Sequence, residues 1–416
     1  MSNEIIITVG HENAEITGNT NTAIQSAVDK AAASGGGIVK ILPGKYIMND
    51  SLHLRSNVTV EGDGESTILW KLASVKSKVA LHAGYGHYDI SVEEPEKFDV
   101  GMGILITGNH SGGFADTVGT VLAKRGNVLL INRMLNNDYA VYADNDSNKA
   151  RDSVVISVYP IISGYGVENA CVKNLTVDGN AEENDAINGC RGGGIFIAQG
   201  RYLKFLNVKV KKYNGDGISF QQCVNTLIDG CIAEDITGVG IHPGSGSVGV
   251  VIRNTKGIRN GHSGLGFCFR VTRTLLENCI FSDNGCWGIG IAGRDTDIEI
   301  RNCEIERNGY YGIHFYKDIQ SQTGNNTLIA DNIIRGNGTR ENKPENTSDI
   351  FIDCKTTGVY IYNNHGAKIK ATDKNYLEYV TFRAPGDDYT FSSSYIDRQD
   401  IEHLGPWEKI KGYESY

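Results

Sequence analysis

Short runs of alternating hydrophobic and polar residues fill most of this 416-residue chain, and turn residues separate them at nearly constant intervals. Six of these runs open with a glycine and an aliphatic residue, and successive starts are 23 or 24 residues apart: Gly194, Gly217, Gly240, Gly264, Gly288 and Gly312. Helical repeats would need apolar periodicity over ten or more residues, which these runs lack. The pattern therefore predicts a solenoid built only from strands and turns.

Equivalent residues of successive coils should stack about 4.8 Å apart and form ladders along the solenoid axis. We expect one internal column of aliphatic residues: Ile195, Ile218, Ile241, Leu265, Ile289 and Ile313. We also expect Cys231, Cys279 and Cys303 to share an inward rung as small apolar side chains. Asn-Gly pairs recur at 214, 260, 284, 308 and 337, which predicts left-handed turns with asparagine side chains hydrogen-bonded along the stack.

Composition supports a folded protein, since hydrophobic residues make up 40% and charged residues 21% of the chain. The net charge is −9 and no basic run interleaves with aromatic residues, which argues against nucleic acid or an anionic membrane as partner. No run of 18 apolar residues predicts a membrane span.

The compartment is predicted from the amino terminus and the cysteines. No basic segment followed by an apolar one opens the chain, so a secretion signal is not visible and the cytoplasm is expected. Secretion or a phage origin is left open. The nine cysteines are an odd number without a CxxC pair, which favours reduced thiols over disulfides or a zinc site.

The repeats resemble the right-handed parallel β-helix of the pectate-lyase-like superfamily. Residues 22–37 and 38–46 are similar to its capping helix and first coil, and residues 54–64 to its second coil. The predicted fold class is all-β, a right-handed parallel β-helix solenoid whose N-terminal helix covers the apolar end. We divide the chain into cap and first coils (1–71), a β-rich insertion (72–163), the β-helix core (164–365) and a C-terminal cap with Trp407 (366–416).

The same resemblance implies a saccharide groove on one sheet of the β-helix. Period-two alternation sends the third and fifth residues of each Gly-Ile strand outward. Small residues at Gly244, Gly266, Gly290 and Ala292 predict a trough there, and it would be walled by side chains from neighbouring coils: His242, Arg270, His314 and Tyr316. Substrate-binding candidates are Gln221, Gln222, Ser245, His314, Tyr316, Arg191 and Arg294.

His242 and Asp216 are the sharpest catalytic candidates. Residues 240–247 interrupt a strand with proline and glycine, and they are similar in part to the catalytic segment of alginate C5-epimerases. The epimerase tyrosine, aspartate and histidine fall on Val239, His242 and Gly244, so epimerisation is not expected. Asp216 lies in a segment similar to an acidic turn of polygalacturonases, whose paired aspartates and Gly-His-Gly motif are not found.

Two chemistries fit such a groove. A lyase acting on a uronate by β-elimination would use His242 as base, Arg270 to neutralise the carboxylate, and Tyr316 or Lys317 as acid. A glycoside hydrolase would use two carboxyl groups, for which Asp216 and Asp295 are the candidates. The lyase is preferred slightly.

A third function, as a non-catalytic glycan-binding or phage tailspike-like module, is also carried forward. The expected partner is a poly- or oligosaccharide, and the protein is expected to be a homotrimer or a monomer. No metal site is assigned, and a divalent cation such as calcium is left open.

Overall fold

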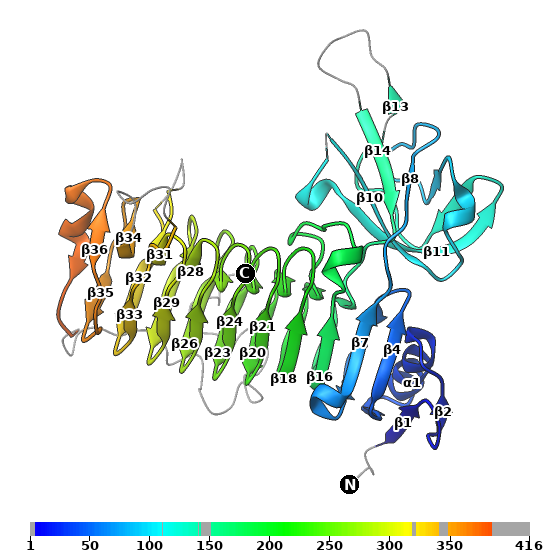
Figure 1. The fold of residues 1–416 in the computed structure, drawn as a ribbon, viewed down its shortest axis with the longest axis horizontal. Coiled ribbons are helices and arrows are strands. Elements are labelled where there is room, and N and C mark those ends of the chain that lie inside the picture. The colour runs from blue at the N-terminus through cyan, green and yellow to red at the C-terminus, as the bar shows by residue number, and fades with distance from the viewer. Residues whose placement is uncertain are drawn as a thin grey trace.

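The computed structural model describes residues 5–109, 111–139, 141–142, 151–317, 322–340 and 348–384. These residues form a right-handed parallel β-helix with a separate antiparallel sheet projecting from one side near its N-terminal end (Figure 1). This confirms the all-β solenoid predicted from the repeat. Among the described residues, no helix is both long enough and apolar enough to cross a membrane.

One wall of the β-helix, which we call the ten-stranded sheet, carries the Gly-Ile segments. Its strands pair in parallel in every case given by the register. They are β5 (Leu52–His53), β15 (Ile162–Tyr165), β17 (Ile195–Ala198), β19 (Ile218–Gln221), β22 (Ile241–Pro243), β25 (Leu265–Gly266), β28 (Trp287–Ile291), β31 (Tyr311–Phe315), β34 (Ser348–Ile352) and β36 (Ile369–Ala371).

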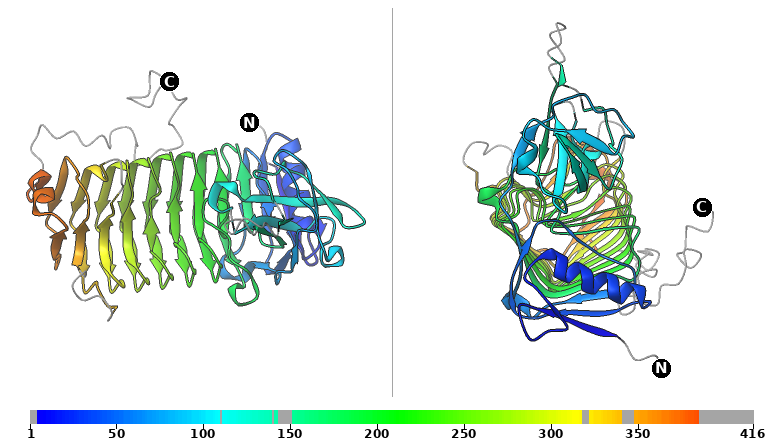
Figure 2. Two further views of the ribbon diagram at one scale, coloured as in Figure 1. Left: turned by 90° about the horizontal axis from the view of Figure 1, so that it is seen from above. Right: turned by 90° about the vertical axis from the view of Figure 1, so that its right-hand side faces the viewer.

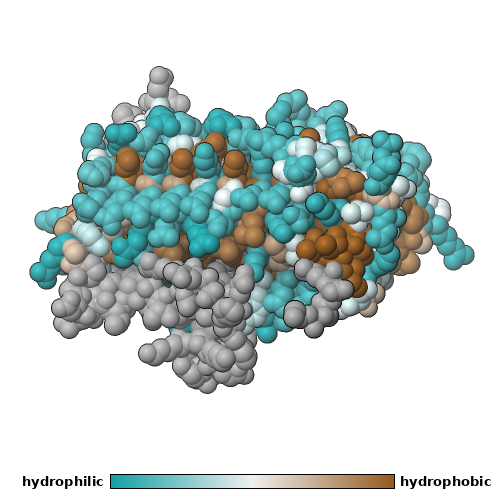
Figure 3. All heavy atoms as spheres, turned by 90° about the horizontal axis from the view of Figure 1, so that it is seen from below, coloured by the Kyte–Doolittle hydropathy of each residue, from teal (hydrophilic) through white to brown (hydrophobic). Residues whose placement is uncertain are grey.

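The remaining strands of the coils join into a second, twenty-stranded parallel sheet. They are β1 (Ile6–Gly10), β2 (Ile16–Thr17), β3 (Gly37–Ile41), β4 (Gly44–Met48), β6 (Val58–Glu61), β7 (Thr67–Lys71), β16 (Cys171–Asp178), β18 (Arg201–Lys211), β20 (Val224–Asp229), β21 (Ile232–Glu234), β23 (Val248–Arg253), β24 (Lys256–Ile258), β26 (Thr272–Glu277), β27 (Ile280–Ser282), β29 (Thr296–Arg301), β30 (Glu304–Glu306), β32 (Asn325–Ala330), β33 (Ile333–Arg335), β35 (Val359–Tyr362) and β37 (Val380–Thr381). Stacking also orders the exterior, where rows of hydrophilic and of hydrophobic residues run parallel to the axis on the face that Figure 3 shows.

The predicted internal column is confirmed. Strand register aligns its members one above another, and each is 0% exposed: Ile195, Ile218, Ile241, Leu265, Ile289 and Ile313. Cys231, Cys279 and Cys303 are buried, and each is at most 1% exposed. All nine cysteines of the chain are free thiols. Removal of these side chains from water is the main stabilising term of the solenoid.

Helix α1 (Asn21–Ala33) lies across the N-terminal end of the stack, as Figure 2 shows in its end-on view. Ile24, Val28 and Ala31 share its buried face, as their spacing predicts. The glycines that follow end the helix, and at Gly36 a Cβ would lie 2.5 Å from the carbonyl oxygen of Asn57. The helix thus covers apolar residues that the first coil would otherwise expose.

The asparagine ladder forms as predicted, but its backbone differs from the prediction. Asn260 Nδ2 donates to Asn284 Oδ1 at 3.0 Å, and the same bond joins Asn284 to Asn308 at 2.9 Å. The left-handed residue is the one before each asparagine, where Arg259, Asp283 and Arg307 have φ of 54°, 59° and 53°. The expectation of left-handed Asn-Gly turns is therefore wrong at these positions.

The glycines of this ladder are required by the close approach of neighbouring coils. A Cβ on Gly285 would lie 2.1 Å from the carbonyl oxygen of Gly261, and one on Gly309 would lie 2.0 Å from that of Gly285. No L side chain fits at such distances without displacement of the backbone.

The inserted sheet is antiparallel and has its own core, which includes Val79, Phe98, Ile104 and Leu129. Its strands are β8 (Lys76–Lys78), β9 (Asp89–Ser91), β10 (Gly103–Gly108), β11 (Thr117–Arg125), β12 (Val128–Ile131), β13 (Val141–Tyr142) and β14 (Arg151–Ile156). At the junction the buried Lys71 ammonium donates to the Ser157 carbonyl oxygen at 2.8 Å. Burial lowers the pKa of Lys71 to about 7.

The coils continue beyond the expected core boundary at residue 365. Strand β36 adds to the ten-stranded sheet and β37 pairs with β35, so one further coil follows where no repeat is visible in the sequence. Residues 385–416, including Trp407, lie outside the described residues. Short 3₁₀ helices connect strands elsewhere: η1 (Gly64–Ser66), η2 (Pro95–Lys97), η3 (Gly113–Ala115), η4 (Ala181–Glu183) and η6 (Lys374–Tyr379).

Replacement of Gly309 tests the close-approach constraint. Gly309→Ala should lower the free energy of unfolding by about 1–3 kcal/mol, because the new methyl group collides with the Gly285 carbonyl. Urea unfolding followed by circular dichroism measures the change. The control is Gly84→Ala, where the nearest atom to a Cβ lies 3.7 Å away. Equal stability of both variants would contradict the constraint.

Candidate functional site

The outward positions of the ten-stranded sheet form a continuous column across the coils. Ser219 pairs in register with His242, and Gly290 pairs with His314. The predicted small-residue positions do not leave an open trough, however. A Cβ on Gly290 would lie 2.7 Å from the Trp287 ring, and one on Gly244 would lie 2.2 Å from the Gln221 side chain. Neighbouring side chains fill the expected space, so the prediction of an open trough at these glycines is wrong.

Asp216 and His242 form a close ion pair at the centre of this face. Asp216 lies just before β19 and His242 lies within β22, and Oδ2 of the aspartate is 2.6 Å from Nδ1 of the histidine. The other carboxylate oxygen accepts a hydrogen bond from the Val239 backbone N–H at 2.9 Å. The two side chains are only 10% and 14% exposed, so solvent screens their interaction little.

The backbone of Gly189 covers one side of this pair. A Cβ at this position would lie 1.7 Å from Asp216 Oδ2 and 2.8 Å from His242 Nδ1. Ser219 Oγ holds the covering segment by donating to the Gly189 carbonyl oxygen at 2.8 Å. The segment belongs to the coil lengthened between β16 and β17, and only glycine fits at its point of contact.

Cys268 extends the pair into a cluster of three reactive side chains. Its sulfur lies 3.1 Å from Ser245 Oγ. Burial opposes ionisation of the thiol, but hydrogen bonds with His242 and Ser245 outweigh burial and lower the pKa of Cys268 to about 7. Burial likewise opposes the charge on His242, yet the Asp216 carboxylate and the contact with Cys268 raise its pKa to about 10. Between about pH 7 and pH 10 the cluster therefore holds a Cys268 thiolate beside a protonated His242.

An aromatic cluster adjoins these residues. Trp287 stacks on Tyr316 with ring centroids 5.4 Å apart and meets the His314 ring edge-on at 4.7 Å. Neither ring nitrogen of His314 has a hydrogen-bond partner among the described residues, and burial lowers its pKa to about 3. His262 contacts the other side of Trp287 at 4.9 Å, and burial lowers its pKa as well.

Asp295 does not join Asp216 as a second open carboxylate. It is 1% exposed, and its two oxygens accept hydrogen bonds from Val271 N at 2.8 Å and Ala292 N at 2.6 Å. Burial raises the pKa of Asp295 well above its usual range. Because both oxygens serve the backbone, the expectation that Asp216 and Asp295 act as a hydrolytic pair has no support in this geometry.

The other predicted residues lie around the cluster in different settings. Arg270, Arg294, Lys317 and Gln222 are exposed, and Arg294 lies 5.8 Å above the Phe269 ring. Gln221 is buried and its Oε1 accepts from Ser245 N at 2.8 Å. Arg191 instead contacts the inserted sheet, where its Nε donates to the Phe114 carbonyl oxygen at 3.1 Å. No group of three His, Cys, Asp or Glu side chains suited to a metal ion occurs among the described residues.

Sequence reasoning missed Cys268, Trp287 and His262 as members of the site. Cys268 stood at an outward position of the predicted column, which was the available signal, but its packing against His242 depends on tertiary structure. Trp287 precedes its Gly-Ile strand by one residue, at the position that Asp216 and Tyr311 occupy in other coils. The Trp287 ring can lie over Gly290 because Gly290 has no side chain.

Together the stacked coils and the outward face define a parallel β-helix protein with a polar cluster on one sheet. The chain belongs to the family described as the right handed beta helix region, which matches residues 118–267 and 193–378 and thereby more than half of the sequence. No curated protein matches it.

Solved structures give the same fold at low identity. The A-module of mannuronan C-5 epimerase AlgE6 from Azotobacter vinelandii is 16% identical, with a TM-score of 0.52 over 85% of this chain and 83% of that one. A structure described as a glycoside hydrolase is 8% identical, with a TM-score of 0.54 over 91% and 99%. An alginate lyase from Paenibacillus sp. is 11% identical, with a TM-score of 0.43 over 89% and 91%. The similarities to the first two structures concern the fold.

Cys268 should be more reactive than the nearby Cys190 at mildly alkaline pH. We expect iodoacetamide to alkylate it with a midpoint near pH 7, whereas burial raises the pKa of the nearby Cys190 to about 11. Peptide mapping by mass spectrometry compares the two sites in one sample. His242→Ala should move the Cys268 midpoint to higher pH. Faster alkylation of Cys190 than of Cys268 at pH 8 would refute the assignment.

Proposed function

We propose that this protein is a carbohydrate-active enzyme, a polysaccharide lyase that cleaves a uronate-containing chain by β-elimination. The observation that carries the proposal is the 2.6 Å Asp216–His242 pair on the outward face of the ten-stranded sheet, in contact with Cys268. Partly buried groups with displaced pKa values in mutual contact are typical of proton-transfer sites.

His242 acts as the acid in this proposal, which revises the role of base assigned from the sequence. A histidine paired with a carboxylate and carrying a pKa of about 10 is protonated at neutral pH. Such a group cannot abstract a proton, but it can donate one to the glycosidic oxygen that leaves. Asp216 is a positioning residue that orients the ring and stabilises its charge.

Cys268 supplies the base. The thiolate is a Brønsted base whose pKa of about 7 suits proton abstraction at neutral pH, and it contacts the histidine that donates. The thiolate would take the proton from the carbon next to the uronate carboxylate, so that a C–H bond breaks and an S–H bond forms. The electron pair forms the carbon–carbon double bond, the glycosidic C–O bond breaks, and His242 protonates the departing oxygen.

Exposed cations near the cluster fit the third requirement of the reaction. Elimination needs a positive group to neutralise the uronate carboxylate and stabilise the charge that develops on it. Arg270 lies two residues beyond Cys268 and is exposed, and Arg294 lies on the next coil. Tyr316 and Trp287 add partly exposed aromatic faces beside them, against which a sugar ring can pack.

The remaining expectations stay predictions. The proposed partner is a poly- or oligosaccharide. The proposed oligomeric state is a monomer or a homotrimer, and the binding of a divalent cation such as calcium stays a prediction. Nine free thiols support the proposed cytoplasmic compartment, since cysteines stay reduced there.

The lyase assay is a panel of polyuronates and neutral glycans followed by the ultraviolet absorbance of the unsaturated product. Wild-type protein should generate this absorbance from at least one polyuronate, and Cys268→Ser and His242→Ala should each lower the rate by about 10²–10⁴-fold. The control is Cys286→Ser, since Cys286 lies outside the cluster and burial raises its pKa. New reducing ends without absorbance would indicate hydrolysis, and binding without turnover would indicate a glycan-binding module; either result would refute the lyase.

The pH dependence of the rate tests the assigned roles. The Cys268 thiol must be deprotonated, so the rate should rise through about pH 7, and His242 must be protonated, so the rate should fall through about pH 10. Asp216→Asn removes the charge that raises the histidine pKa, which should move the alkaline limb to lower pH. A limb that stays in place in this variant would exclude His242 as the acid.

A further inference from the structure

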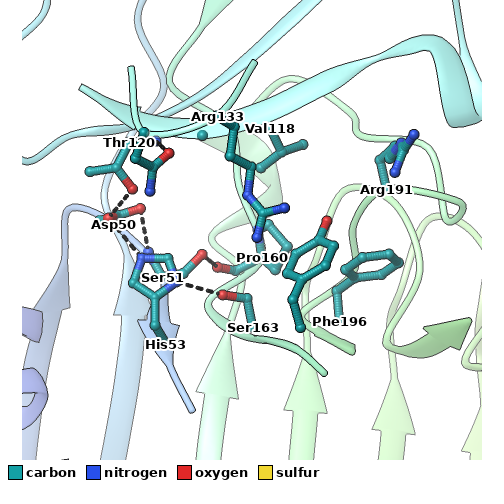
Figure 4. A pocket seen from close by; sticks show the side chains of 13 residues that line it. Asp50, Ser51, His53, Val118, Thr120, Arg133, Pro160, Ser163, Arg191 and Phe196 are labelled. Carbon is teal, nitrogen blue, oxygen red and sulfur yellow. Dashed lines mark hydrogen bonds and ion pairs between the residues drawn. The ribbon is translucent and has the colours of Figure 1, made fainter. Parts of the chain in front are cut away.

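A pocket lies where the inserted sheet overhangs the first coils of the ten-stranded sheet. Its lining comes from both parts of the molecule, as Figure 4 shows: Asp50, His53 and Ser163 belong to the coils, and Thr120 and Arg133 to the inserted sheet. A second, more open pocket shares His53, Ser163 and Arg133 and continues the hollow along β15. None of these residues belongs to the Asp216–His242–Cys268 cluster.

A serine, a histidine and an aspartate form a hydrogen-bonded relay in this pocket. His53 Nδ1 lies 2.9 Å from Ser163 Oγ, and His53 Nε2 lies 3.1 Å from Asp50 Oδ2. His53 and Ser163 are register partners in β5 and β15, so the parallel sheet itself places the two side chains next to each other. The arrangement is that of a nucleophile, a base and an acid that orients the base.

The acid of the relay is firmly held. Asp50 Oδ1 accepts from the Ser51 backbone N–H at 2.8 Å, and Thr120 Oγ1 of the inserted sheet donates to Asp50 Oδ2 at 2.7 Å. The Asp50 side chain is 8% exposed, whereas the His53 side chain is 35% exposed. A buried carboxylate thus faces an imidazole that opens to the pocket, where it can exchange a proton with a bound molecule.

The pocket is cationic above the relay. Arg133 extends from the inserted sheet into the pocket near His53 and Ser163, and its guanidinium lies 3.6 Å over the Tyr165 ring (Figure 4). Arg191 lines the opposite side. These positive groups favour an anionic ligand and can stabilise negative charge that develops on an oxygen beside Ser163.

We propose that Ser163, His53 and Asp50 form a second catalytic site that hydrolyses an O-acyl ester on an acidic saccharide. Ser163 Oγ attacks the ester carbonyl carbon and its proton passes to His53 Nδ1. The bond from the acyl carbon to the sugar oxygen breaks, and His53 protonates that oxygen as the alcohol leaves. Water, deprotonated by His53, then attacks the acyl carbon and forms a new C–O bond. The bond from the acyl carbon to Ser163 Oγ breaks, His53 returns the proton to Oγ, and the carboxylic acid leaves.

This site is independent of the proposed lyase but faces the same side of the molecule. Ser163, Phe196, Ser219 and His242 are successive register partners, which places Ser163 and His242 three coils or about 14 Å apart. One bound saccharide chain can therefore reach both sites. Removal of acyl groups at the first would expose the free sugar to the second.

Labelling with a fluorophosphonate probe tests the nucleophile. The full-length protein should form a covalent adduct that peptide mapping assigns to Ser163, and it should release acetate from an O-acetylated polyuronate. Ser163→Ala should abolish both signals, and His53→Gln, which keeps a polar side chain of similar reach, should lower the labelling rate by about 10²-fold or more. The control is Ser66→Ala, an exposed turn serine whose hydroxyl donates to the Asp63 carbonyl oxygen.

The outcomes separate this proposal from the lyase. Thermal unfolding of each variant shows whether the junction still folds, and polyuronate elimination is measured on the same samples. Absence of an adduct in the wild-type protein, or an adduct that persists in folded Ser163→Ala, would overturn the esterase and leave the relay as a junction between the sheets. Labelling at Ser163 without any elimination would sustain the esterase and refute only the lyase.

Discussion

The spacing of about 4.8 Å between stacked strands governs almost every feature of this molecule. It requires that each residue tolerate its own equivalent directly above and below, which selects aliphatic columns inside and asparagine ladders at the turns. At Gly285 and Gly309 the constraint is strict, because a neighbouring carbonyl occupies the place of a side chain. It also brings side chains distant in sequence into contact, since one coil separates register partners by only 23 or 24 residues in the regular part of the helix.

Both reactive clusters arise from this stacking. Ser219, whose hydroxyl holds the segment over the ion pair, is the register partner of His242, and His53 is the register partner of Ser163. A rigid sheet holds such pairs without a mobile loop, so little ordering is required when a ligand binds. The charges of Asp216 and His242 remain because they satisfy each other at 2.6 Å; removal of either would leave a poorly solvated charge.

The fold could be predicted from sequence because its repeat is a local, periodic signal. The internal column and the helix over the N-terminal end follow from spacing alone, and both are found where expected. His242 and Asp216 could also be identified as candidate site residues from the sequence. His242 lies in a segment that interrupts a predicted strand, and Asp216 precedes one. Their direct contact is a tertiary result, as is the recruitment of Cys268.

The orientation of large side chains next to glycines could not be predicted from the sequence. Trp287 covers Gly290 and Gln221 covers Gly244, so the expected trough is occupied. The pocket below the inserted sheet could not be predicted either, because Asp50 and Ser163 lie 113 residues apart and the strands between them, β8 to β14, carry no repeat. Only the docking of that sheet shows that Thr120 and Arg133 complete the pocket.

The segment around Gly189 contacts both the β-helix and the inserted sheet. Its backbone lies against the Asp216–His242 pair, and two residues later Arg191 is bonded to Phe114 of the inserted sheet. Residues 189–191 therefore join the cover of the ion pair to the inserted sheet, so the shielding of the central coils depends in part on how that sheet is docked.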